Sequence, residues 1–79
     1  MREMTFKMER EGLLHEGDPV TVTEGILPTS YYYTIYPALA MSGNVPFPER
    51  MLARSGVVKK IEQNERGFYV VAVFDEPEQ

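Results

Sequence analysis

The stretch that decides the fold is "GVVKKIEQNERGFYVVAVFDE", residues 56–76. Two runs rich in β-branched and aromatic residues flank a polar turn at residues 64–67, whose glycine can take the positive φ that such turns need. This pattern predicts an antiparallel hairpin. The expected pairs are Gln63 with Phe68, Ile61 with Val70, Lys59 with Ala72 and Val57 with Phe74. The returning run "FYVVAVF" is apolar on both faces, which predicts a central strand covered on both sides.

Three earlier runs also predict strands, two by their period and one by its composition. The segment "EMTFKME" (residues 3–9) alternates Met4, Phe6 and Met8 with polar residues, and "PVTVTE" (19–24) does the same with Val20 and Val22. A third β-rich run covers residues 31–36. As a strand, this run would place Tyr31, Tyr33 and Ile35 on one face and Tyr32, Thr34 and Tyr36 on the other.

The remaining segments predict a loop and a short helix. "ALAMSGNVPFP" (38–48) has neither period and is rich in turn residues, so we expect a loop. "PERMLARSG" (48–56) predicts a helix of about two turns, with Pro48 and Glu49 at its start, Arg54 in its last turn and Gly56 as its stop.

These elements predict a mainly β chain of five strands with one short helix between the third and fourth. The stretch "SGVVKKIEQNERGFYVVAVF" (55–74) resembles the hairpins of KOW-type SH3-like modules, in which a glycine opens a strand and an aromatic-aliphatic strand returns. The element order is similar to that of a small SH3-like β-barrel. Such barrels bind RNA, proteins or proline-rich peptides, so the resemblance implies a shape more than an activity.

Size and composition restrict the function further. Residues 1–79 predict a single domain, with a frayed acidic tail at 75–79. The chain has no cysteine, no signal-peptide pattern and no apolar stretch long enough to span a membrane, so we expect a soluble cytoplasmic protein of bacterial or archaeal type. The net charge of −4 opposes binding to a polyanion or an anionic membrane.

Catalysis and metal binding have little support in the residues. His15 is the only histidine, and its neighbours Glu16 and Asp18 lack the spacing of a zinc motif, so they are more typical of a capped turn. The glycines at 12 and 17 match a phosphate-binding loop only in spacing, because Asp18 stands where a lysine is needed. We therefore expect a non-enzyme with no metal and no cofactor.

Residues 26–48 carry no charge, and they suggest a docking surface for a protein. Tyrosine, proline and phenylalanine bury a large area with little loss of rotamer entropy. The predicted binding residues are Tyr32, Tyr36, Pro37, Pro46 and Phe47, with Arg50 as a polar margin. The partner would be a peptide or a second copy of the chain. Alternatively, residues 38–52 form a lid over one face of the tyrosine run, and the rings belong to the core.

A basic cluster supports a second hypothesis, single-stranded nucleic-acid binding. Cations would hold phosphates while adjacent tyrosines stack on bases. The cations concerned are Arg50, Arg54, Lys59, Lys60 and Arg66. Three interspersed carboxylates, Glu49, Glu62 and Glu65, weaken this reading.

Overall fold

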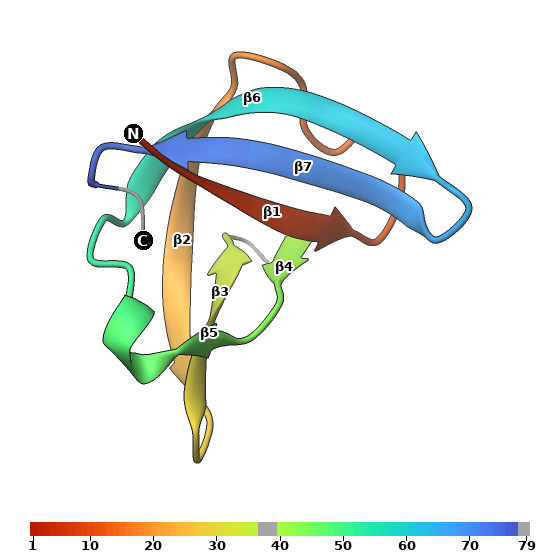
Figure 1. The fold of residues 1–79 in the computed structure, drawn as a ribbon. Helices are drawn as coiled ribbons and strands as arrows, with labels where there is room; N and C mark the ends of the chain where they lie inside the picture. Colours follow the sequence, from red (N-terminus) through yellow and green to blue (C-terminus); the bar gives the residue numbers. More distant parts are fainter. Residues whose placement is uncertain (37–39, 78–79) are drawn as a thin grey trace.

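The computed structural model describes residues 1–36 and 40–77 and is a mainly β, closed barrel. Antiparallel pairing runs in the order β2-β6-β7-β1-β4-β3, and β3 pairs back to β2 to close the ring, while β5 continues along β3 (Figure 1). A closed ring leaves few strand edges without a partner. The elements are β1 (Arg2–Met8), β2 (Pro19–Ile26), β3 (Ser30–Ile35), β4 (Ala40–Ser42), β5 (Val45–Pro46), the 3-10 turn η1 (Phe47–Glu49), β6 (Ser55–Asn64) and β7 (Gly67–Phe74).

The predicted hairpin is confirmed as β6–β7. Gly67 takes a φ of 134°, and the pairs Gln63–Phe68 and Ile61–Val70 are as expected. Beyond them the predicted register is wrong by one residue, because a bulge at Lys59 pairs Val58, not Lys59, with Ala72, and Gly56, not Val57, with Phe74. A bulge adds one residue to one strand and bends it. The bend lets both Val58 and Ile61 face the barrel interior, where Val58 is buried and Ile61 packs against the core.

The other three predicted strands are also confirmed, as β1, β2 and β3. Their alternation selects the inward faces, where Phe6, Met8, Val20 and Val22 are buried. In β3, Tyr33 and Ile35 point into the core, while Tyr31 on the same face is only partly buried. The inward residues of β7 complete the core: Val70, Ala72 and Phe74.

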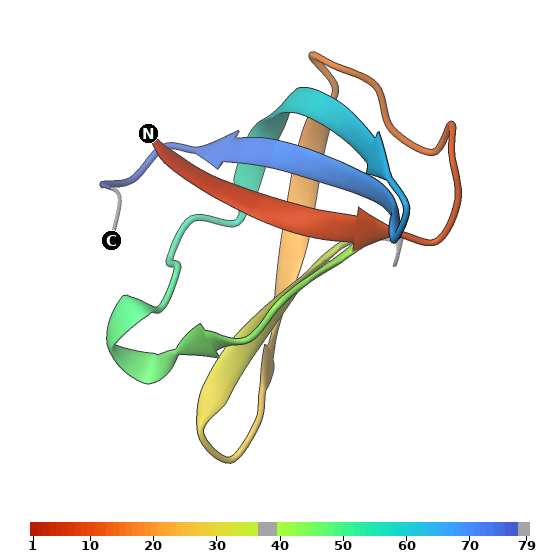
Figure 2. The same cartoon turned by 45° about the vertical axis from the view of Figure 1, so that its right-hand side comes forward.

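Residues 40–56 differ most from the sequence-based expectation; residues 38 and 39 of the expected loop lie outside the described residues. The expected loop contains β4 and β5, two short strands that pair with β3 and bring the strands in the described part of the chain to seven. The expected two-turn helix is only the 3-10 turn η1, after which Arg50 takes an extended conformation (φ −47°, ψ 133°). Residues 50–54, here called the closing segment, then cross from η1 to β6 (Figure 2). No helix among the described residues is long and apolar enough to cross a bilayer.

Candidate functional site

The closing segment is anchored by Met51, whose side chain is fully buried in the core. Its backbone amide donates a hydrogen bond of 2.8 Å to the hydroxyl of Tyr33, and this hydroxyl lies 2.9 Å from Glu24 Oε2 and can donate to it. Tyr33 has no exposed surface, and burial raises the pKa of its hydroxyl. The tyrosine in the middle of the uncharged stretch is therefore a core residue that fixes the closing segment.

Glu24 connects β2 to both arginines of the predicted helix. Arg50 donates from Nε and Nη2 to the two carboxylate oxygens at 2.9 and 2.8 Å, and Arg54 Nη2 lies 3.4 Å from the same group. The Glu24 side chain is only 10% exposed. The hydrogen bond from Arg50 is the main cause that lowers the pKa of Glu24, and burial opposes it. The carboxylate therefore stays charged and holds both arginines at the end of the barrel.

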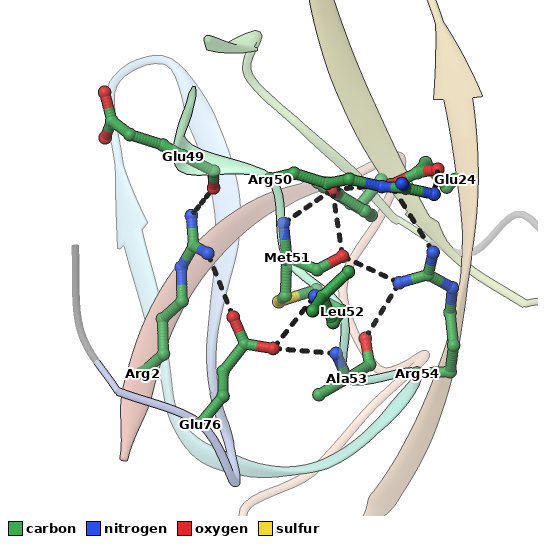
Figure 3. Close-up of polar contacts among 10 residues, drawn as sticks. Arg2, Glu24, Glu49, Arg50, Met51, Leu52, Ala53, Arg54 and Glu76 are labelled. Atoms are coloured by element: carbon green, nitrogen blue, oxygen red, sulfur yellow. Dashed lines mark hydrogen bonds and ion pairs between the residues drawn. The ribbon is translucent and has the colours of Figure 1, made fainter. Parts of the chain in front are cut away.

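A second carboxylate, that of Glu76, holds the opposite side of the closing segment (Figure 3). Its Oε1 accepts hydrogen bonds from the amides of Leu52 and Ala53 at 2.9 and 2.7 Å, and its Oε2 pairs with Arg2 at 3.0 Å. Arg2 also donates to the carbonyl of Glu49 at 2.7 Å. Glu76 belongs to the tail that we expected to fray, and through Arg2 it links both chain ends to this segment. Residues 78–79 of that tail lie outside the described part.

Acid should weaken these contacts. Burial raises the pKa of Glu76, but hydrogen bonds from the Ala53 amide, Arg2 and the Leu52 amide outweigh it, so the pKa lies below the ordinary 4.5, as it does for Glu24. A carboxylate with a lowered folded pKa stabilises the fold above its unfolded pKa and loses that contribution as the pH falls through its folded pKa. We expect a steady Tm down to about pH 5, then a decline below pH 4.5. The Tm of the Glu76→Gln variant should be lower than that of wild type above pH 5 and should decline less as the pH falls. An equal decline of the two Tm values in thermal scans would contradict this role of Glu76.

The uncharged stretch forms an apolar surface at the tip of the β2–β3 hairpin. Ile26 lies directly opposite Tyr31 in the ladder, so both side chains point to the same face. The Tyr31 ring meets the Phe47 ring edge-on at 4.9 Å between centroids, and the Arg50 guanidinium lies 5.1 Å from the Tyr31 centroid. Ile26 is 70% exposed, Phe47 42% and Leu27 36%. We name this surface the tip patch: Ile26, Leu27, Tyr31 and Phe47.

The structure brings together only some of the predicted docking residues. Phe47 lies in the tip patch and Arg50 at its margin, while exposed Pro46 pairs with Ser30 beside it. Tyr32 points to the opposite face of β3, where its ring lies over Gly25 of β2. Tyr36 is 68% exposed just beyond the other end of β3. Pro37 lies outside the described residues.

Sequence reasoning missed Ile26, Leu27 and Tyr31. Alternation placed Tyr31 on the same face as Tyr33 and Ile35, which is correct, but Tyr31 lies beside the tip of the β2–β3 hairpin. At that end of β3 the core covers the ring only in part. The one available signal was the turn-rich "LPTS" (27–30), which marks a hairpin tip between two apolar residues, Ile26 and Tyr31.

The predicted basic strip is divided and largely paired. Arg50 and Arg54 share Glu24, whereas Lys59 pairs with Glu3 at 2.6 Å and Lys60 with Glu62 at 3.3 Å. Arg66 lies in the turn between β6 and β7, at the end of that hairpin away from the closing segment (Figure 1). The structure therefore brings only two of the five cations together, around a carboxylate.

No protein-family model, curated protein or solved structure matches this chain. The turn at His15 is held by its own residues, since Asp18 Oδ2 accepts a hydrogen bond of 2.8 Å from the His15 amide. Within residues 1–36 and 40–77, no three histidine or carboxylate side chains gather as metal ligands would.

Proposed function

We propose that the protein is a non-catalytic interaction module that docks a short segment of a partner protein on the tip patch. The observation that carries this proposal is the exposure of Ile26 and Phe47 beside the Tyr31 ring, within a stretch without charge. Clustered apolar and aromatic side chains of this kind are typical of the anchors that dominate binding at protein interfaces.

The contacts that hold Tyr31 within the patch also favour binding. Tyr31 contacts both the Phe47 ring and the Arg50 guanidinium, and Glu24 fixes Arg50 in turn. A ring already held in place loses little conformational entropy when a partner covers it, so more of the interaction energy remains as affinity.

A peptide segment fits the patch better than a second copy does. A stable protein interface buries about 800 Å² on each partner. That area would be close to one sixth of the 5119 Å² surface of this chain, far more than four partly buried side chains offer. Self-association is therefore an outcome that the tests must exclude, and light scattering of the purified protein excludes it.

Single-stranded nucleic acid is the weaker candidate. Binding to phosphates requires cations that are free to replace counterions. Four of the five cations proposed for that role are already engaged by carboxylates of this chain.

In keeping with the docking role, we assign the barrel to the SH3-like kind with a KOW-type hairpin, and we place the protein in the cytosol, where a chain without cysteine needs no oxidising environment.

A displayed library of random peptides tests the proposal. Clones selected on the wild-type protein should include a set rich in large apolar residues that does not bind the Ile26→Ser/Phe47→Ser double variant. As synthetic fluorescent peptides, these clones should bind that variant at least tenfold more weakly than wild type in polarisation titrations, because the anchors that they contact are missing.

A matched control uses Tyr36→Ser/Leu52→Ser, which removes two side chains outside the patch that are 68% and 71% exposed. Binding to this variant should stay within about twofold of wild type. Equal binding of the selected peptides to both double variants and wild type would overturn the tip patch. A larger loss in the control variant would move the docking surface to Tyr36 or Leu52.

A further inference from the structure

A second surface stands out through its cations. The chain has eight lysine and arginine side chains, and five of them form ion pairs: Arg2, Arg50, Arg54, Lys59 and Lys60. Within residues 1–36 and 40–77, the three without an ion pair are Lys7, Arg10 and Arg66. They follow one another around a single end of the barrel, at the end of β1, in the next loop and in the β6–β7 turn. The positive charge that forms no ion pair within the described chain is therefore concentrated there.

Two concavities adjoin at this end of the barrel. One, of about 480 Å³, is lined by Lys7, Glu9, Met41, Arg66 and Phe68, together with Met8 and Gly67. The other, of about 320 Å³, shares Lys7, Glu9 and Met41 with the first and extends to Tyr32 and Thr34. We call the two together the cationic groove. It passes over β3, β4 and β1 to the β6–β7 turn.

Met41 lines both concavities. It lies opposite Lys7 of β1 and opposite Thr34 of β3, and it is 52% exposed although it is apolar. The Lys7 stem reaches the hairpin turn, since a Cβ built on Gly67 would lie 3.4 Å from Lys7 Cε. The lysine is thereby placed beside the turn that carries Arg66. The groove thus offers an adaptable apolar side chain flanked by two cations that form no ion pair within the described chain.

We propose that the cationic groove binds an extended acidic segment of a partner protein. Carboxylates of the segment would pair with Lys7 and Arg66, and an apolar side chain between them would cover Met41. Charge complementarity of this kind steers association and selects the partner. No lining residue of the groove belongs to the tip patch, so this inference stands apart from the proposed function, and the module would hold two segments at once.

The carboxylates around the groove favour a peptide over a nucleic acid. Glu9 lines both concavities, and Glu62 and Glu65 line the hollows on the other side of Arg66. A polyphosphate chain carries a charge on every unit and would pass close to these carboxylates. A peptide can place its few acidic residues only where Lys7 and Arg66 lie.

The experiment selects displayed random peptides on the wild-type protein and removes those that also bind the Lys7→Gln/Arg66→Gln variant. This removal discards binders of the tip patch, which that variant retains. The surviving clones should be enriched in aspartate and glutamate. As fluorescent peptides, they should bind the variant at least tenfold more weakly than wild type, and affinity should fall as salt rises.

The control variant Lys59→Gln/Lys60→Gln loses the same charge outside the groove and should stay within about threefold of wild type. Circular dichroism melting of both variants should match that of wild type, because all four side chains are exposed. The inference is overturned if no clone survives, if the survivors are not acidic, or if both variants lose binding equally. It is also overturned if a fluorescent oligothymidine binds wild type more tightly than every surviving peptide.

Discussion

Replacing Met51 with alanine should lower the free energy of unfolding by about 2–5 kcal/mol, the range for truncating a fully buried methionine. The side chain is completely enclosed and belongs to the core cluster, although its neighbours in the closing segment lie at the surface. Alanine would leave a cavity where this segment enters the barrel. Urea unfolding followed by circular dichroism measures the loss, which is a large part of the 5–15 kcal/mol typical of small domains.

Two companion variants make that result specific. Met51→Leu conserves most of the volume and should cost less than about 1.5 kcal/mol. Leu52→Ala removes the adjacent side chain, which is 71% exposed, and should change stability by no more than about 0.5 kcal/mol. If Met51→Ala cost no more than Leu52→Ala, the closing segment would not be anchored in the core.

The second large effect is expected at Gly56, where β6 begins to pair with β7. A Cβ there would lie 2.4 Å from the carbonyl oxygen of Val73 and 2.7 Å from Cδ1 of Phe74. Because the first of these atoms is backbone, Gly56→Ala must displace the strand or the buried Phe74 ring, at a cost of about 1–3 kcal/mol.

Gly43→Ala is the matched control, because nothing lies within 4 Å of a Cβ built at that position. The same urea titration should give a change within about 0.5 kcal/mol for this variant. Equal effects of the two substitutions would mean that the backbone of β7 does not lie against Gly56.

The strands could be predicted because their signals are local. Alternation in β1 and β2, and the glycine turn after β6, depend on neighbouring residues and need no knowledge of the rest of the chain. The register beyond Ile61 could not be predicted, because nothing in "VVKK" (57–60) marks a bulge. The bulge follows from the barrel, which needs both Val58 and Ile61 on its inner face.

The helix predicted at residues 48–56 does not form, because this segment bonds to residues that are distant in the sequence. Pro48, Glu49 and Arg54 have the order of helix-end signals. In the structure, however, Arg50 and Arg54 form ion pairs with Glu24 in β2. Glu76 accepts hydrogen bonds from the amides of Leu52 and Ala53. These partners lie more than twenty residues away in sequence. Their hydrogen bonds replace those that a short helix would have made within itself.

The candidate site was predictable in kind and only partly in position. The absence of charge in residues 26–48 pointed to an apolar surface, and Phe47 and Arg50 do lie together at one. Two features depend on how far the β2–β3 hairpin extends beyond the barrel. One is the pairing of Ile26 with Tyr31, and the other is the point below them at which the core ends. No periodicity in the sequence gives that distance.

The most direct test of the tip patch is a chemical-shift titration of the ¹⁵N-labelled protein with the tightest selected peptide that the Ile26→Ser/Phe47→Ser variant does not bind. We predict that the largest amide shifts fall in residues 26–31 and 45–50, with little change at Tyr36 and Lys7. Shifts that are largest outside these two segments would contradict the account, since the double substitution would then have acted by distorting the barrel and not by removing a contact.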